Sequence, residues 1–197
     1  DSMKPFWTEI FSNPSSKSNL AGINARAILE SSREKIERNL FLNDKKIIFT
    51  SGATESNNLA LLGYARNFYK KTGNYGNIVT LKTEHKAVLE PLKQLEKEGF
   101  SVTEITPERD GLILEENFIK SIREDTFMVS IMMANNEIGV IQPIQNISKI
   151  CESRGITFHS DFAQCLGYLE LKDLLPNINM ITMSSHKIYG PKGIGLF

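Results

Sequence analysis

The chain has 197 residues, and its 23 Lys and Arg balance 23 Asp and Glu, so its formal net charge at pH 7 is zero. This balance gives no electrostatic reason to expect nucleic acid or a membrane surface as a partner, and it favours a small-molecule substrate. No apolar stretch approaches the roughly 20 residues needed to cross a bilayer, and residues 1–11 lack the pattern of a signal peptide. We therefore expect a soluble, cytoplasmic protein.

Segments with helical periodicity alternate with short apolar runs along the chain. The helical pattern is clearest over residues 25–40, 59–69, 88–95 and 144–150. The apolar runs, which we predict to be strands, cover residues 47–49, 78–81, 102–105, 127–133, 156–158 and 179–183. Alternating strands and helices predict an α/β fold with a mostly parallel sheet that helices cover on both faces.

Polar residues follow most of these predicted strands. In chain order they are Asn57, His85, Asn136, Asp161 and Lys187. Ligands of such sheets bind at the carboxyl ends of the strands, so we expect these side chains to meet in one crevice.

The two cysteines, Cys151 and Cys165, are too far apart to form a Cys-x-x-Cys redox or zinc motif. Cys151 falls in a helical pattern with Ile147 and Ile150 and is predicted to belong to the core. Cys165 follows Gln164, and we also expect it to pack as a small hydrophobe. Both are expected to be reduced.

The most informative segment is residues 184–195, Ser-Ser-His-Lys-Ile-Tyr-Gly-Pro-Lys-Gly-Ile-Gly, which follows an apolar run. Lys187 leaves the end of a buried strand among small residues, where a backbone can approach a ligand closely. A lysine in such a place can bind an aldehyde covalently. This position predicts a lysine that holds a carbonyl cofactor.

Two further features suit pyridoxal phosphate, which needs an acid beside its ring nitrogen and an anion site. Asp161 stands at the end of an apolar run and can be that acid. Residues 50–58, Thr-Ser-Gly-Ala-Thr-Glu-Ser-Asn-Asn, read as a turn of small residues followed by a helix start. Backbone N–H groups and hydroxyls there would cradle a phosphate.

Two other interpretations compete with this one. His159 and Asp161 share one strand face and could ligate a metal, but no third ligand of fitting spacing accompanies them, and we predict no metal. Residues 50–58 could form a nucleotide loop, but the terminal Gly-Lys-Ser/Thr of that motif is absent.

Several strings in order resemble the cysteine desulfurases, the NifS-like branch of the class V aminotransferases, which are fold-type I pyridoxal phosphate enzymes. They are residues 50–56 (Thr-Ser-Gly-Ala-Thr-Glu-Ser), 83–88 (Thr-Glu-His-Lys-Ala-Val), 135–139 (Asn-Asn-Glu-Ile-Gly), 161–164 (Asp-Phe-Ala-Gln) and 185–193 (Ser-His-Lys-Ile-Tyr-Gly-Pro-Lys-Gly). One string alone would be weak, whereas their order and spacing match along nearly the whole chain.

The resemblance implies a role for each matching residue. Lys187 would bind the cofactor and act in catalysis with His85, which would stack on the ring and relay protons, while Asp161 would keep the ring nitrogen protonated. Asn136 and Gln164 would bond the phenolic oxygen and the substrate carboxylate, and Thr54, Ser184 and His186 the phosphate. The full predicted cofactor-binding set is Ala53, Thr54, His85, Asn136, Asp161, Gln164, Ser184, His186 and Lys187. Capping and turn roles remain open for the polar members.

Some positions depart from the family pattern. Ser185 stands where Gly is usual, and its side chain is expected to crowd the lysine or the cofactor phosphate. Asn19 and Met133 stand where His is frequent. The resemblance also implies a chain truncated at both ends: residues 1–197 would be a pyridoxal phosphate-binding large domain, without the small domain that holds the persulfide-forming cysteine and the arginine for the substrate carboxylate.

The implied function is the cofactor-binding part of a cysteine desulfurase, which converts L-cysteine to L-alanine and passes the sulfur on as a persulfide for iron–sulfur cluster assembly. The implied partners are a second copy, as a homodimer, and an iron–sulfur scaffold or sulfur-acceptor protein. The alternative is an inactive remnant that only binds cofactor or dimerises. We expect this chain alone to be inactive.

Overall fold

The computed structural model describes residues 3–42, 46–169, 171 and 177–197. The chain forms two compact units, Asp1–Ile47 and Ile48–Phe197, which are taken one at a time below. This division does not test whether the chain is a single cofactor-binding domain, which stays a prediction.

The first unit contains two helices, α1 (Pro5–Thr8) and α2 (Leu20–Asn39). The side chain of Asn19 accepts a 2.7 Å hydrogen bond from the Gly22 N–H and caps α2. Asn is among the best N-cap residues, so the helix begins earlier than the apolar periodicity indicates. This cap also gives a local structural role to a residue that departs from the family pattern.

The second unit is built on a seven-stranded sheet in the order β1-β7-β6-β5-β4-β2-β3. The strands are β1 (Phe49–Thr50), β2 (Asn77–Leu81), β3 (Ser101–Ile105), β4 (Thr126–Ser130), β5 (Thr157–Asp161), β6 (Met180–Ser184) and β7 (Gly195–Leu196). β3, β2, β4, β5 and β6 pair in parallel, whereas β7 is antiparallel to both β6 and β1. The predicted mostly parallel sheet is confirmed.

All six strand predictions differ from the structure at one or both ends. β5 has the largest extension, since it ends at Asp161 rather than at residue 158. β1 lies over Phe49–Thr50 rather than 47–49. β4 ends at Ser130, three residues before the predicted end. On its β2 side the Met132 N–H donates to the Glu84 side chain, although the Ile131 and Met133 N–H groups still donate to carbonyls of β5. β7 was not predicted, since two residues are too few to show a strand pattern.

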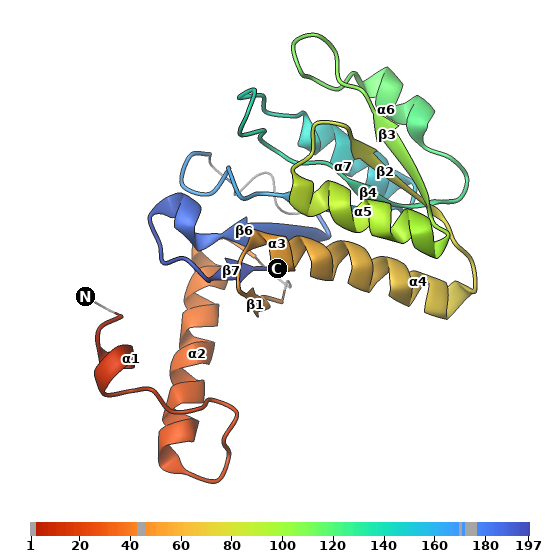
Figure 1. Ribbon diagram of the computed structural model, residues 1–197. Coiled ribbons are helices and arrows are strands. Elements are labelled where there is room, and N and C mark those ends of the chain that lie inside the picture. Colours follow the sequence, from red (N-terminus) through yellow and green to blue (C-terminus); the bar gives the residue numbers. More distant parts are fainter. Residues whose placement is uncertain (1–2, 43–45, 170, 172–176) are drawn as a thin grey trace. The chain divides into compact units, whose positions relative to one another are not determined.

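Helices cover both faces of the sheet. They are α3 (Ala53–Asn58), the π-helix η1 (Leu59–Gly63) and α4 (Tyr64–Thr72), which follow one another without a break, then α5 (Lys86–Glu98), α6 (Glu115–Ser121) and α7 (Ile144–Ser153). The β2 to β3 connection runs toward one edge of the sheet, and the β3 to β4 and β4 to β5 connections run toward the other. Because parallel crossovers are right-handed, α5 covers one face and α6 and α7 the other. Contacts of α5 with α3, and of α6 with α7, agree (Figure 1).

The core between the sheet and the α4–α5 layer consists of large apolar side chains. Its buried members are Leu61, Ala65, Ile78, Val88, Leu92, Leu95, Phe100, Phe127 and Met128. The ring of Phe127 stacks on that of Phe68, with 4.0 Å between the centroids. Burial of this apolar area is the main favourable term that holds the helices against the strands.

Within the described part of the chain, none of the helices has the length and apolar character required of a membrane span.

Candidate active site

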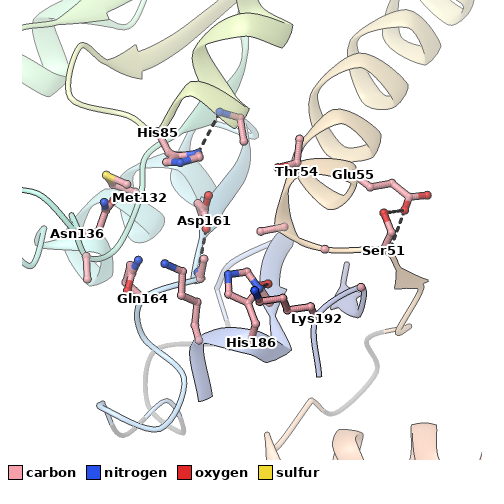
Figure 2. A pocket seen from close by; sticks show the side chains of 18 residues that line it. Ser51, Thr54, Glu55, His85, Met132, Asn136, Asp161, Gln164, His186 and Lys192 are labelled. Atoms are coloured by element: carbon pink, nitrogen blue, oxygen red, sulfur yellow. Dashed lines mark hydrogen bonds between the residues drawn. The ribbon is translucent and has the colours of Figure 1, made fainter. Parts of the chain in front are cut away.

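A cavity of about 440 Å³ opens in the second unit where the carboxyl ends of β1, β2, β4, β5 and β6 meet (Figure 2). It is lined by Ser51, Gly52, Ala53, Thr54, Glu55, His85, Ala87, Met132, Ala134, Asn136, Asp161, Ala163, Gln164, Ser184, His186, Lys187, Lys192 and Gly193. Every residue of the predicted cofactor-binding set is among them. The chain reverses its direction of winding between β2 and β4, and such a switch point is where α/β sheets bind ligands.

Lys187 reaches the cavity from η2 (Ser185–Ile188), a short 3-10 helix that begins directly after β6. The turn around it is held by backbone bonds, 3.1 Å from the Ser185 N–H to the Ile194 carbonyl and 3.0 Å from the Gly190 N–H to the Ser185 carbonyl. Tyr189, just after η2, has a φ of 61°, a left-handed conformation that is uncommon for a residue with a side chain. A strained turn therefore presents Lys187 to the cavity.

Asp161 ends β5 and is 5% exposed. Its Oδ1 accepts a hydrogen bond from the Ala163 N–H and its Oδ2 one from the Asn57 side-chain amide, both at 2.8 Å. Burial raises the pKa of Asp161, while these two hydrogen bonds and the charges of His85 and Lys187 act in the opposite direction.

The surroundings of Asp161 provide a test of whether the cavity fits pyridoxal phosphate. No cation among the described residues forms an ion pair with this carboxylate. A buried carboxylate in a cavity is stabilised by a cationic partner, and a protonated ring nitrogen supplies one. The Asp161 carboxylate at this end of the cavity therefore fits the ring nitrogen of pyridoxal phosphate.

His85 is the N-cap of α5, and its Nδ1 accepts a 3.1 Å hydrogen bond from the Ala87 N–H. Since Nδ1 accepts, the proton of a neutral ring is on Nε2. Figure 2 shows the ring close to Asp161, in agreement with the charge interaction between the two side chains. The cap fixes the imidazole at the wall of the cavity.

Asn136 lies in a turn closed by the bridge between Ala134 and Ile141. The preceding residue, Asn135, holds this turn: its amide donates 2.7 Å to the Thr83 carbonyl, and its Oδ1 accepts the N–H groups of Glu137 and Ile138. The loop of His85 and the loop of Asn136 are thereby tied together.

The opposite end of the cavity is formed by the turn after β1 and by β6. The Ser184 hydroxyl and His186 Nδ1 are 2.7 Å apart, and the Thr50 and Ser56 hydroxyls are 2.7 Å apart. β7 packs directly on the turn, since a Cβ added to Gly195 would lie 2.5 Å from the Gly52 Cα. Hydroxyls, an imidazole and the start of α3 are groups suited to a phosphate.

The expectation that the Ser185 side chain crowds the lysine or the phosphate gains no support from the structure. Ser185 does not line the cavity, and its hydroxyl donates to the Pro191 carbonyl. The added side chain thus stabilises the turn behind Lys187.

Both cysteines are fully buried free thiols, and neither lines the cavity, as predicted for packing residues. The metal interpretation gains no support. The described residues contain no group of three or more His, Cys, Asp or Glu that could hold an ion, and His159 Nδ1 is 2.9 Å from the Ser130 hydroxyl. Burial lowers the pKa of His159 to about 3.

Several residues that shape the site were missing from the predicted set. Lys192, Met132 and Ser51 line the cavity, and Thr182 and Glu84 act from behind it. Asn57 was expected in the crevice with the other strand-end residues, but it is buried and does not line the cavity; it bonds Asp161 from behind. Ser51, Glu84 and Lys192 belong to the family-like strings, which was the available signal, but a string does not reveal which neighbours each side chain contacts.

The comparisons with known proteins agree with this geometry. The aminotransferase class-V family matches residues 1–197. The chain is 47% identical over 195 residues to cysteine desulfurase IscS of Neisseria meningitidis serogroup A (strain Z2491), with 99% of this chain and 48% of the relative covered. It is 44% identical over 195 residues to the mitosomal cysteine desulfurase of Encephalitozoon cuniculi, with 99% and 45% covered.

Among solved structures, the chain is similar to SspA in complex with cysteine, with a TM-score of 0.90 and 39% identity over 99% of this chain and 55% of that one. A NifS-like protein gives a TM-score of 0.90 and 38% identity over 98% and 53%. The chain spans about half the length of the relatives it matches.

Proposed function

We propose, on the premise that this chain belongs to the class V aminotransferase family, that it is the cofactor-binding part of a pyridoxal phosphate-dependent cysteine desulfurase. The reaction would be that of L-cysteine with a protein thiol. The C–S bond of cysteine breaks, an S–S bond forms on the thiol, and a proton reaches the former sulfur-bearing carbon, which leaves L-alanine and a persulfide. The sulfur would serve iron–sulfur cluster assembly.

The observation that carries this proposal is the meeting of Lys187, Asp161 and His85 in one cavity from three separate elements. When bound, pyridoxal phosphate would supply an electron sink for bonds at the α-carbon of an amino acid. Lys187 would hold the aldehyde and move a proton with its amine, Asp161 would accept the ring N–H, and His85 would cover the ring. The turn after β1 and the residues around Ser184 and His186 would hold the phosphate.

The thiol that accepts sulfur is proposed to lie outside these 197 residues. The chain has two cysteines. Burial raises the pKa of Cys151 and of Cys165 to about 12, so neither supplies a thiolate near neutral pH. We therefore propose that the chain alone does not turn over cysteine.

Reduction and peptide mapping test the proposal. The purified chain is incubated with pyridoxal phosphate, reduced with borohydride and digested. The pyridoxyl label is expected on Lys187 and to be lost in Lys187→Ala, whereas Lys192→Ala, which changes another lysine of the same cavity, keeps it. A label spread over surface lysines, or the same label in Lys187→Ala, would contradict cofactor binding at this site.

A turnover assay tests whether the chain alone is active. The chain that takes the pyridoxyl label on Lys187 is incubated with L-cysteine and pyridoxal phosphate, and the alanine and persulfide that form are measured. Specific labelling without turnover is expected, and it also agrees with the alternative of a cofactor-binding or dimerising module. Robust turnover that Cys165→Ala abolishes would show that Cys165 is the acceptor.

Homodimerisation and a protein partner are further parts of this proposal. Apolar side chains are exposed on the loops that carry site residues, among them Ile138, Tyr168 and Tyr189, the last 98% exposed. Such surface is often covered by another chain. L-Cysteine is the proposed substrate, a scaffold or sulfur-acceptor protein the proposed partner, and sedimentation of the purified chain tests the dimer.

The proposed compartment is the cytoplasm, supported by the two free buried thiols, which suit a reducing environment. One relative is named as mitosomal. Cell fractionation decides between the compartments.

A further inference from the structure

We propose that Asn57 is a positioning residue, held in place by Thr182, that orients the Asp161 carboxylate and favours its ionised form. This inference rests on the proposed function for its purpose, because an ionised Asp161 is the partner that a protonated ring nitrogen needs. The arrangement itself belongs to the chain alone and is tested below without cofactor.

The three side chains form a continuous line across the unit. Thr182 lies on β6, Asn57 on α3 and Asp161 at the end of β5. The Thr182 hydroxyl donates a 2.6 Å hydrogen bond to Asn57 Oδ1, and Asn57 Nδ2 donates a 2.8 Å bond to Asp161 Oδ2. Asn57 and Thr182 are fully buried, so no water competes for these groups.

Thr182 determines which end of the Asn57 amide faces Asp161. An amide presents an acceptor at one end and donors at the other. Because the Thr182 hydroxyl donates to the oxygen end, the NH₂ end is directed at Asp161. Thr182 is itself fixed by its strand, since its carbonyl accepts the Phe162 N–H at 2.8 Å.

Asn57 is the neutral side-chain donor to a carboxylate that is surrounded by several titratable groups. His85 and Lys187 favour the ionised form of Asp161 through their charges. The buried carboxyl of Glu84 and the buried thiol of Cys165 also interact with it electrostatically. Donors to the charged form oppose the cost of burial. Without Asn57, the Ala163 N–H is the remaining described hydrogen-bond donor to the Asp161 carboxylate.

The chain offers a matched control in Asn77, on β2. Asn77 is also fully buried, it donates through Nδ2 to the Thr126 hydroxyl at 2.9 Å, and its Oδ1 accepts from the Thr103 hydroxyl at 2.9 Å. Asn77 is thus a buried asparagine whose oxygen accepts from a threonine hydroxyl, as in Asn57, but it lies at the amino end of a strand and does not bond Asp161. A leucine at either asparagine removes the same kinds of bonds.

The experiment is an acid titration of Asp161 in the full 197-residue chain without cofactor. Aspartate labelled at its carboxyl carbon is followed by NMR, and Asp161→Asn assigns the signal. In Asn57→Leu the Asp161 midpoint is expected to move to higher pH than in wild type. Thr182→Val, which keeps the shape of the side chain but removes its hydroxyl, is expected to give a smaller shift in the same direction. Asn77→Leu is expected to leave the midpoint unchanged.

Unchanged Asp161 midpoints in both Asn57→Leu and Thr182→Val would overturn the inference, as would an equal shift in Asn77→Leu. If Asn57→Leu does not fold, Thr182→Val alone carries the test. With cofactor added, the folded variants are expected to hold it about tenfold more weakly than wild type, with an altered visible spectrum, because an ionised partner is lost from the ring. A wild-type chain that binds no cofactor refutes the proposed function, whereas the cofactor-free titration still decides on Asn57.

Discussion

The backbone N–H of Met132 donates a 2.6 Å hydrogen bond to Oε1 of the Glu84 side chain. This bond ties the residue before His85 to the segment that follows β4, and both segments line the cavity. Glu84 Oε2 has no hydrogen-bond partner among the described residues. Burial raises the pKa of Glu84 well above its ordinary value of 4.5, and the charge of Asp161 raises it further, against the effect of the Met132 bond.

This raised pKa predicts a pH-dependent cost that Glu84→Gln removes. Above pH 4.5 the unfolded chain releases the Glu84 proton while the folded chain retains it, so the free energy of unfolding falls as pH rises. Glutamine has no proton to release but still accepts from Met132. Urea unfolding from about pH 4.5 to about pH 8 is expected to show a smaller loss of stability in Glu84→Gln than in wild type. Glu116→Gln, at an exposed position, serves as control. Equal slopes for wild type and Glu84→Gln would contradict the prediction.

His159 predicts the opposite slope. Burial lowers the pKa of His159 from 6.5 to about 3, so the folded chain keeps the ring neutral while the unfolded chain protonates it. The free energy of unfolding therefore decreases as pH falls from 6.5 toward about 3. His159→Asn, which can still bond Ser130, is expected to lose about 1–3 kcal/mol near neutral pH through the smaller side chain but to depend less on pH in acid. Thermal unfolding measures both effects, with the exposed His186→Asn as control. Parallel pH profiles of wild type and His159→Asn would show that the His159 ring does not cause the loss of stability in acid.

The cysteines are expected to be protected in the folded chain. Burial raises the pKa of Cys165 to about 12, with a contribution from the charge of Asp161, and burial likewise raises that of Cys151 to about 12. A maleimide reagent near neutral pH should modify neither thiol in the native chain and both in denaturant, as mass spectrometry of the digest would reveal. Rapid native modification of Cys165, prevented by bound cofactor, would mean that the thiol faces the cavity.

The turn behind Lys187 is expected to depend on the contact between Ser185 and Gly190. A Cβ at Gly190 would lie 2.9 Å from both the Ser185 carbonyl oxygen and its Oγ. Ser185→Gly removes the bond to Pro191 and is expected to cost about 0.5–1.5 kcal/mol, and Gly190→Ala about 1–3 kcal/mol. The double variant should lose less than the sum, because the overlaps with Oγ and Cβ disappear with the serine side chain and the overlap with the carbonyl oxygen remains. Urea unfolding of all four chains measures this coupling, and strict additivity would argue against the contact.

The strand and helix order was predictable because each element leaves a local pattern. The apolar run at residues 78–81 became β2 and the periodicity of 88–95 became α5, with only their ends extended. The two-residue β7 escaped prediction, and so did the antiparallel pairing that closes the sheet against the turn after β1. Such pairing depends on residues far apart in the chain and leaves no periodic signal.

By itself, the sequence determined the family strings, the alternating elements and the residues that gather at the cavity, because strand ends carry their polar residues in short, local runs. Only the tertiary structure decided what stands behind them. Asn57 meets Asp161 across 104 positions of the chain and Thr182 across 125, and the Ser185 hydroxyl turns toward Pro191 rather than toward the lysine. Hydrogen bonds between buried polar groups are set by how the layers pack, which no local pattern records.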